Sequence, residues 1–157
     1  MDALTFAGQP LVIVDYAHTP DALKQALSAL RPVAESRTGK LICVFGCGGN
    51  RDASKRPLMA AVAEELADAV VVTSDNSRSE KIQKILDHIS VGFKSKQDVL
   101  IEVNRAIAIA RTIKNAHRED VILIAGKGHE NYQDEMGVKT YFSDKEQAAQ
   151  ALTGYEG

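Results

Sequence analysis

The sequence lacks the features that would place it in several special classes of protein. No apolar run approaches the roughly 20 residues that a membrane-spanning helix needs, and the first ten residues have neither the basic start nor the apolar core of a secretion signal. Lysine and arginine number 19 against 21 aspartates and glutamates, so the net charge of -2 indicates no surface built for nucleic-acid phosphates. We therefore expect a cytoplasmic protein that binds neither membranes nor nucleic acid.

Cysteine is also scarce, with Cys43 in an apolar run and Cys47 in a glycine-rich segment. Two cysteines cannot supply the four ligands of a structural zinc site, and a disulfide requires an oxidising compartment. Cys43 is predicted to be a small core residue. The 157 residues are 45% hydrophobic and 25% charged, which is typical of one folded domain with a substantial core.

Short β-branched segments alternate along the chain with segments whose apolar residues recur at helical spacing. Strands are expected at residues 11–16, 41–45, 69–73, 99–103 and 121–125. Helices are expected between them, with Pro32 ending the first one and with Ser143 and Glu146 as the capping box of the last. The pattern predicts an α/β protein with a Rossmann-like, mostly parallel sheet, helices on both faces and one antiparallel edge strand at residues 139–142.

The polar residues gather in four segments, each of which follows a predicted strand. These segments are Asp15–Asp21, Gly46–Asp52, Ser74–Glu80 and Gly126–Asn131. Ligands of open parallel sheets bind beyond the carboxyl ends of the strands. We therefore expect the four segments to meet at one edge of the sheet and to form a binding site there.

The first two segments have the chemistry of nucleotide and anion sites. Asp15 and His18 can hold a ribose hydroxyl and an adenine or phosphate edge, and the alternative is that they only cap the turn. The glycines of 46–52 allow backbone N–H groups to approach an anion, and Arg51 can clamp a carboxylate or phosphate. The alternative here is a flexible turn, because neither the dinucleotide fingerprint nor a P-loop motif is present.

The other two segments have the chemistry of an amino-acid site. Asp75 suits an ammonium group, Arg78 suits a carboxylate, and Asn76 suits either; a solvated turn is the alternative. Glu130 can pair with an amine of the ligand. His129 has a near-neutral intrinsic pKa, but no nucleophile or metal motif accompanies it, so a positioning or structural role is expected.

Together these segments resemble the C-terminal domain of the Mur ligases, most closely of the UDP-N-acetylmuramoyl-tripeptide synthetase (MurE) type. The matching blocks are V-D-Y-A-H-T-P-D-A-L (14–23), F-G-C-G-G-N-R-D (45–52), K-R-P-L-M (55–59), D-N-S-R (75–78), A-G-K-G-H-E (125–130) and F-S-D-K-E (142–146). They occur in the family's order over nearly the whole chain. Each block alone is weak evidence, but their occurrence in the same order makes the probability of a chance match very small.

The resemblance implies that the chain is the last of three domains of an ATP-dependent, amide-forming enzyme of peptidoglycan synthesis. Residues 1–10 would be a linker from the preceding domains, and residues 11–157 would be the C-terminal domain. In the family, the central domain carries the P-loop, the Mg²⁺ ligands and a carbamylated lysine. The resemblance therefore implies no catalytic residue and no metal ligand on this chain, and an isolated chain without ligase activity.

The resemblance also implies the reaction and the residues that bind its substrates. ATP phosphorylates the D-glutamate carboxylate of UDP-MurNAc-L-Ala-D-Glu, and the amino group of the incoming amino acid then attacks the acyl phosphate. Asp15 and His18 fall where the family contacts ATP. The positions that fall where the family grips meso-diaminopimelate are Arg51, Asp75, Asn76, Ser77, Arg78, Gly126 and Glu130. We expect the protein to be a monomer.

The choice of amino acid follows from charge. Meso-diaminopimelate differs from L-lysine by a second carboxylate, which requires a cation such as Arg78. Family members that use diaminopimelate usually carry D-N-P-R, whereas Ser77 replaces the proline here. The alternatives are a lysine-adding enzyme, another Mur-type or folylpolyglutamate-type ligase, and a stand-alone ligand-binding module.

Overall fold

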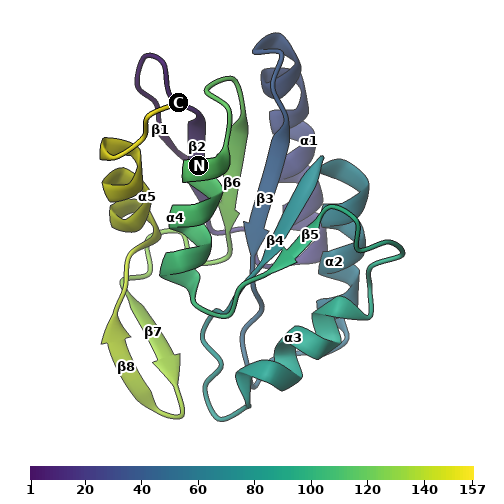
Figure 1. Cartoon of the computed structure of the whole chain (residues 1–157). Helices are drawn as coiled ribbons and strands as arrows, with labels where there is room; N and C mark the ends of the chain where they lie inside the picture. The colour runs from purple at the N-terminus through teal and green to yellow at the C-terminus, as the bar shows by residue number, and fades with distance from the viewer.

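The computed structural model describes all 157 residues, and its centre is a six-stranded sheet covered by helices (Figure 1). The strands are β1 (Asp2–Leu4), β2 (Leu11–Asp15), β3 (Leu41–Phe45), β4 (Ala69–Val72), β5 (Val99–Ile101) and β6 (Val121–Ala125). Their spatial order is β1-β2-β6-β3-β4-β5, and only β1 runs antiparallel to its neighbour. The predicted α/β class and mostly parallel sheet are thereby confirmed.

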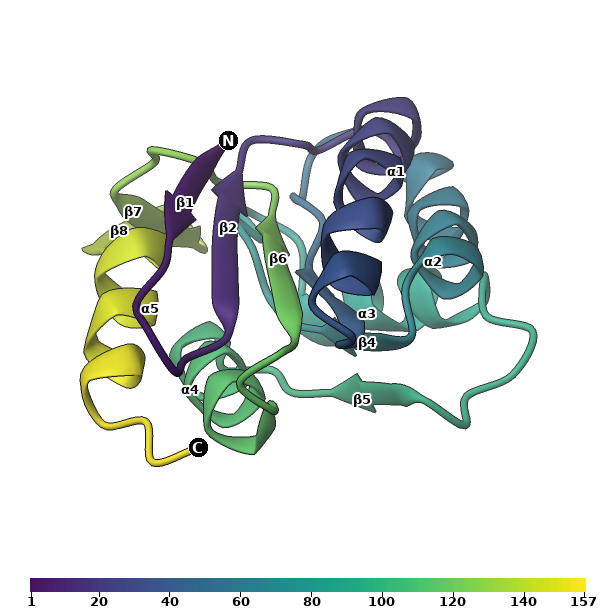
Figure 2. The same ribbon diagram turned by 90° about the horizontal axis from the view of Figure 1, so that it is seen from above.

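Both faces of the sheet are buried, which explains why its strands are almost continuously apolar. The helices are α1 (Pro20–Ser36), α2 (Lys55–Leu66), α3 (Ile82–Ser90), α4 (Arg105–Asn115) and α5 (Asp144–Thr153). Figure 2 shows α1, α2 and α3 on one face and α4 and α5 on the other. Side chains alternate between the faces, so that Ile13 and Leu123 join the core under α1 to α3, while Val14 and Ile124 join the core under α4 and α5.

The predicted antiparallel edge strand exists, but its predicted position was wrong. The antiparallel edge strand is β1, which pairs with β2 and lies inside the segment predicted to be a linker. Residues 139–142 do not join the main sheet. Instead, β8 (Val138–Tyr141) pairs with β7 (Tyr132–Glu135) in a separate two-stranded hairpin. All four residues of β8 are exposed, so this strand has no apolar side to bury in the main core.

The first helix does not end at Pro32, as the sequence predicts, but continues to Ser36. A proline inside a helix removes one hydrogen bond and costs about 3 kcal/mol or more. The turn that follows compensates, because Ala34 is fully buried against the core and the Arg37 N–H bonds the Val33 carbonyl. The predicted cap at Ser143 is confirmed, since its hydroxyl accepts from the Glu146 N–H, and Thr19 caps α1 in the same way by accepting from the Ala22 N–H.

The order of the strands brings the polar loops together. After β5 at one edge, the chain returns through α4 and inserts β6 between β2 and β3. The parallel strands β2, β6, β3 and β4 therefore end side by side, and the β7–β8 hairpin extends beyond their carboxyl ends (Figure 1). None of the helices is long and apolar enough to cross a membrane.

Candidate functional site

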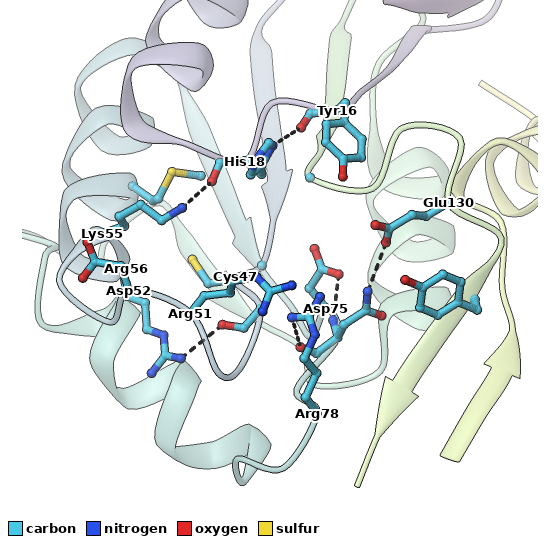
Figure 3. Close-up of a pocket in the computed structure, with 16 residues that line it drawn as sticks. Tyr16, His18, Cys47, Arg51, Asp52, Lys55, Arg56, Asp75, Arg78 and Glu130 are labelled. Carbon is cyan, nitrogen blue, oxygen red and sulfur yellow. Dashed lines mark hydrogen bonds between the residues drawn. The ribbon is translucent and has the colours of Figure 1, made fainter. Parts of the chain in front are cut away.

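A cavity of about 480 Å³ lies at the carboxyl ends of the strands (Figure 3). The loops after β2, β3, β4 and β6 contribute to it, together with the start of α2 and one residue of β7. Its lining residues are Tyr16, His18, Gly46, Cys47, Gly48, Arg51, Asp52, Lys55, Arg56, Met59, Asp75, Asn76, Arg78, Gly126, Glu130 and Tyr132. In Figure 3, Tyr16 and His18 lie across the cavity from Asp75 and Arg78. The expected meeting of the four loops is thereby confirmed.

Most of the predicted site residues line this cavity, and two do not. Those that line it are His18, Arg51, Asp75, Asn76, Arg78, Gly126 and Glu130. Ser77 is buried on the side of the loop that faces α4 and the hairpin, and its hydroxyl has no hydrogen-bond partner. Asp15 caps its own turn, where its Oδ2 accepts a bond of 3.0 Å from the Ala17 N–H. The roles of these residues in binding stay predictions.

The glycine-rich loop is held against the loop that follows β4. The Gly49 N–H donates to the Asn76 carbonyl at 2.7 Å, and the Arg78 Nη1 donates to the Gly49 carbonyl at 2.9 Å. A Cβ at Gly49 would lie 1.8 Å from the Ser77 carbonyl oxygen, so no other residue fits here without movement. The loop is therefore a fixed wall of the cavity, and the alternative of a flexible turn does not match the structure.

Arg56 anchors the same loop from beneath. Its guanidinium is 1% exposed and donates to the Gly48 carbonyl at 3.1 Å, to Glu80 Oε1 at 3.1 Å and toward His88 Nδ1 at 3.0 Å. The hydrogen bond from Arg56, with one from the Asn50 N–H, lowers the pKa of Glu80 to about 2. His88 is half-buried on α3, where its ring contacts the Arg56 guanidinium.

The loop after β4 presents Arg78 from a strained backbone position. Arg78 has a φ of 51°, in the left-handed region that few residues other than glycine adopt. Backbone bonds with the hairpin stabilise it there, because its N–H donates to the Asp134 carbonyl and its carbonyl accepts from the Met136 N–H. Arg51 makes a single side-chain bond, to the Asn50 carbonyl, and is exposed. Arg51, Arg56 and Arg78 thus all line the cavity, and Arg56 is the one already bonded to a carboxylate.

A buried ionic cluster of Asp75, Arg105, Lys127 and Glu130 lies beneath the cavity. Burial raises the pKa of Asp75, but the charges of Arg105 and Lys127 outweigh it and hold this pKa below its usual value. Lys127 Nζ lies 3.2 Å from Asp75 Oδ1 and 3.5 Å from Glu130 Oε1. A Cβ at Gly126 would lie 2.9 Å from Asp75 Oδ2, and its φ of 118° also favours glycine. Asp75 is therefore ionised and closely confined.

Aromatic and basic groups gather at the remaining side. The rings of Tyr16 and His18 meet edge to face with their centroids 4.8 Å apart, and His18 Nδ1 lies 2.9 Å from the Tyr16 carbonyl oxygen. Lys55 Nζ lies 3.5 Å from the His18 carbonyl oxygen. This arrangement offers a ring face and a nearby ammonium, which suit a base and a phosphate.

Several lining residues were not singled out in the sequence. Lys55 and Arg56 follow the glycine-rich loop directly, and that position was the available signal. Tyr132 belongs to the hairpin, which the sequence did not predict as a pair of strands. Burial raises the pKa of the Cys47 thiol to about 12, so the thiol is protonated at neutral pH and is no ready nucleophile. No three His, Cys, Asp or Glu side chains are grouped as metal ligands.

The fold and the cavity define an α/β domain with a cavity of mixed charge at the carboxyl edge of its sheet. Comparison with known proteins gives the family. The model of the "Mur ligase, glutamate ligase domain" family matches residues 1–128, and the chain belongs to this family.

The curated relatives carry one name. The chain is 59% identical over 152 residues to the UDP-N-acetylmuramoyl-L-alanyl-D-glutamate--2,6-diaminopimelate ligase of Acidovorax sp. (strain JS42), which covers 97% of the chain and 30% of that protein. It is 54% identical to the ligase of that name from Pseudomonas aeruginosa, over 99% of the chain and 31% of that protein. The chain thus spans about 30% of the length of these relatives.

Solved structures agree with this fold. A structure of a UDP-N-acetylmuramoyl-L-alanyl-D-glutamate--2,6-diaminopimelate ligase superposes with a TM-score of 0.89 at 39% identity, over 98% of this chain and 31% of that one. A folylpolyglutamate synthase/dihydrofolate synthase from Yersinia pestis, complexed with AMPPNP and a manganese ion, has a TM-score of 0.60 at 20% identity, over 78% of this chain and 27% of that one. The second likeness shows the fold alone.

Proposed function

We propose that this chain holds the amino acid and part of the nucleotide in an ATP-dependent ligase that adds meso-diaminopimelate to UDP-MurNAc-L-Ala-D-Glu. One observation carries the proposal: Arg51 and Arg78 share a single cavity with the carboxyl groups of Asp75 and Glu130. The names of the relatives support this substrate. The domain would act in the cytoplasm, as a monomer, in the synthesis of peptidoglycan.

The charges of the cavity match those of the ligand. Diaminopimelate carries an ammonium and a carboxylate at each end, whereas L-lysine carries no carboxylate at its far end. The Arg78 guanidinium would bind the far carboxylate, and Asp75 with Glu130 would bind an ammonium. Arg51 is exposed at the rim and would bind the second carboxylate. Lysine would leave the Arg78 guanidinium without a carboxylate partner, which disfavours lysine as the ligand.

The nucleotide would lie at the side of Tyr16 and His18. A ring face of the Tyr16–His18 pair would stack on the base, and the Lys55 ammonium would bind a phosphate. The residues present are therefore compatible with ATP. When bound, ATP supplies the activation of the acceptor's carboxylate. The chain shows no grouped metal ligands that fit Mg²⁺, so no step of the reaction is assigned here to a metal ion.

The contribution of this chain is positioning. The amine of the amino acid must attack the carbonyl carbon of the acyl phosphate. A C–N bond forms, the C–O bond to the phosphate breaks, inorganic phosphate leaves and the amine loses a proton. Holding two reactants in one geometry contributes a large part of such a rate enhancement. Here the two arginines and two carboxylates would fix both ends of the amino acid. Closing this cavity over the acceptor would also exclude water from the activated carboxylate.

The proposal is tested by replacing Arg78 with alanine in the protein that contains this domain. A lost charge-assisted hydrogen bond costs about 1.5–3 kcal/mol, so the kcat/KM for diaminopimelate should fall roughly 10- to 100-fold. The value for L-lysine should change little. Arg118→Ala is the matched control, because Arg118 is exposed and pairs only with Glu119. An unchanged preference for diaminopimelate in Arg78→Ala would contradict the proposal.

A further inference from the structure

Lys127 is an unusual lysine because its side chain is completely buried beneath the cavity. It follows β6, between Gly126 and Gly128, which both have positive φ. Its ammonium donates to Asn76 Oδ1 at 2.9 Å and to the Tyr132 carbonyl at 2.8 Å. Buried lysines are rare unless they are paired, and this one contacts parts of three different loops.

Asn76 is fixed by the same contacts. Its side-chain oxygen accepts from Lys127 and from the Asp134 N–H at 3.0 Å, while its side-chain nitrogen donates to Glu130 Oε1 at 3.0 Å. Turning the amide over would place its N–H groups against two other donors. Asn76 is 2% exposed. Its amide is therefore committed to protein groups and orients Glu130.

The charges beneath the cavity do not cancel. Arg105 forms a two-bond pair with Asp144, at 2.8 and 2.7 Å, and these two buried charges balance each other. Lys127 faces the two other carboxylates, those of Asp75 and Glu130, and Arg105 Nη1 also lies 4.0 Å from Asp75 Oδ2, so two cations stand against three carboxylates. One negative charge remains at the wall of the cavity. A ligand ammonium is the group that this charge suits.

We propose that Lys127 is a positioning residue that orients Asp75, Asn76 and Glu130 to receive an ammonium group of the amino acid. Lys127 does not touch the ligand itself. Without it, Asp75 would keep only the more distant Arg105, Glu130 would lose its ion pair, and Asn76 would lose one of the two donors that select its orientation. This inference rests on the proposed function, because it assigns a role within the same amino-acid site.

The test compares Lys127→Ala with Lys139→Ala in the protein that contains this domain. Lys139 is a matched control, since its ammonium lies 4.8 Å from the Tyr132 ring centre, yet it is exposed and bonds none of the carboxylates. Lys127→Ala should raise the KM for meso-diaminopimelate at least tenfold and leave the KM for ATP within about twofold. Lys139→Ala should leave both unchanged.

Chemical rescue separates positioning from a general loss of structure. The alanine leaves space for a small amine, so added ethylammonium should restore at least a third of the lost kcat/KM for diaminopimelate. If Lys127→Ala does not fold, Asn76→Asp replaces it, because a second oxygen facing Glu130 should raise the same KM by a similar factor. Circular dichroism and the melting temperature report whether each variant is folded.

The outcomes are distinct. An unchanged KM for diaminopimelate in folded Lys127→Ala, or a raised KM that ethylammonium does not lower, overturns the positioning role while the proposed function stands. If the unmodified protein shows no diaminopimelate-dependent release of phosphate from ATP, the proposed function fails first, and this inference fails with it.

Discussion

Replacing Arg105 by methionine is expected to destabilise the chain by about 3–5 kcal/mol, because it leaves a carboxylate buried without a partner. Arg105 and Asp144 are both fully buried, and two charge-assisted hydrogen bonds join them. Arg105 also donates to the carbonyls of Ser74 and Ala125, at 3.1 and 3.2 Å. Ser74 directly precedes Asp75, and Ala125 directly precedes Gly126. The two cavity loops that begin there should therefore become more mobile as well.

The size of this effect follows from the lost contacts. Removing one partner of a buried pair costs more than the pair contributes, since the desolvation of the remaining charge is no longer compensated. Domains of this kind unfold with about 5–15 kcal/mol, so the loss is a large share of the total. For a chain of this length, it corresponds to a fall in the melting temperature of roughly 6–20 °C.

Urea denaturation of the chain and its variants measures the effect. The double replacement Arg105→Met with Asp144→Leu removes both charges and should recover at least half of the lost stability. Arg111→Met is the control, because Arg111 is 62% exposed and forms a surface pair with Glu102. A loss below about 1 kcal/mol in Arg105→Met, or no recovery in the double variant, would refute the reasoning.

Three further predictions concern the loops of the cavity. Ser77→Pro should stabilise the chain by about 0.4–1 kcal/mol in urea denaturation, because the Ser77 N–H makes no hydrogen bond and its hydroxyl is buried without a partner; a loss of stability would contradict this. Gly126→Ala should cost about 1–3 kcal/mol in the same assay, because its Cβ would press on Asp75 and its φ is positive; an unchanged midpoint would argue against this confinement. Arg56 lowers the pKa of Glu80 from 4.5 to about 2, so the contribution of Glu80 to stability is complete above pH 4.5 and is lost as the pH falls toward 2. Glu80→Gln should therefore make the urea midpoint decline less steeply between pH 5 and pH 3. An equally steep decline in the variant would count against this role of Glu80.

The main sheet and its helices could be predicted because their signals are local. Each inner strand is an apolar run, and the helices carry apolar residues at regular spacing, so a short window of sequence is enough. The carboxyl-end rule then located the four loops of the site without any knowledge of the coordinates. Charged residues of these loops, such as Arg51 and Glu130, could be recognised because the strands before them are wholly apolar.

The edges of the fold were harder to predict because their residues show little pattern. β1 has three residues and no alternation of polar and apolar side chains. β8 is wholly exposed, so no buried face marks it as a strand. The available signal was Gly137, because glycine is common in the tight turns of hairpins. In the structure, Met136 and Gly137 form the turn between β7 and β8, and both have positive φ.

The buried cations could not be located from the sequence. Arg56 and Lys127 lie in or near predicted site segments, but lysine and arginine are usually exposed, and nothing in the sequence around them or around Arg105 shows that these side chains are buried. Several of their partners are far away in sequence, such as Asp144, which lies 39 residues from Arg105, and Asn76, which lies 51 residues from Lys127. Such pairing depends on the finished packing of the sheet and helices.

The central claim is that one cavity binds the two ends of a doubly acidic amino acid, and a structure of the whole protein with meso-diaminopimelate tests it most directly. The account predicts a ligand carboxylate within about 3.2 Å of the Arg78 guanidinium and a ligand ammonium within hydrogen-bond distance of Asp75 or Glu130. A ligand bound outside this cavity, or one whose ammonium faces Arg78, would contradict the account.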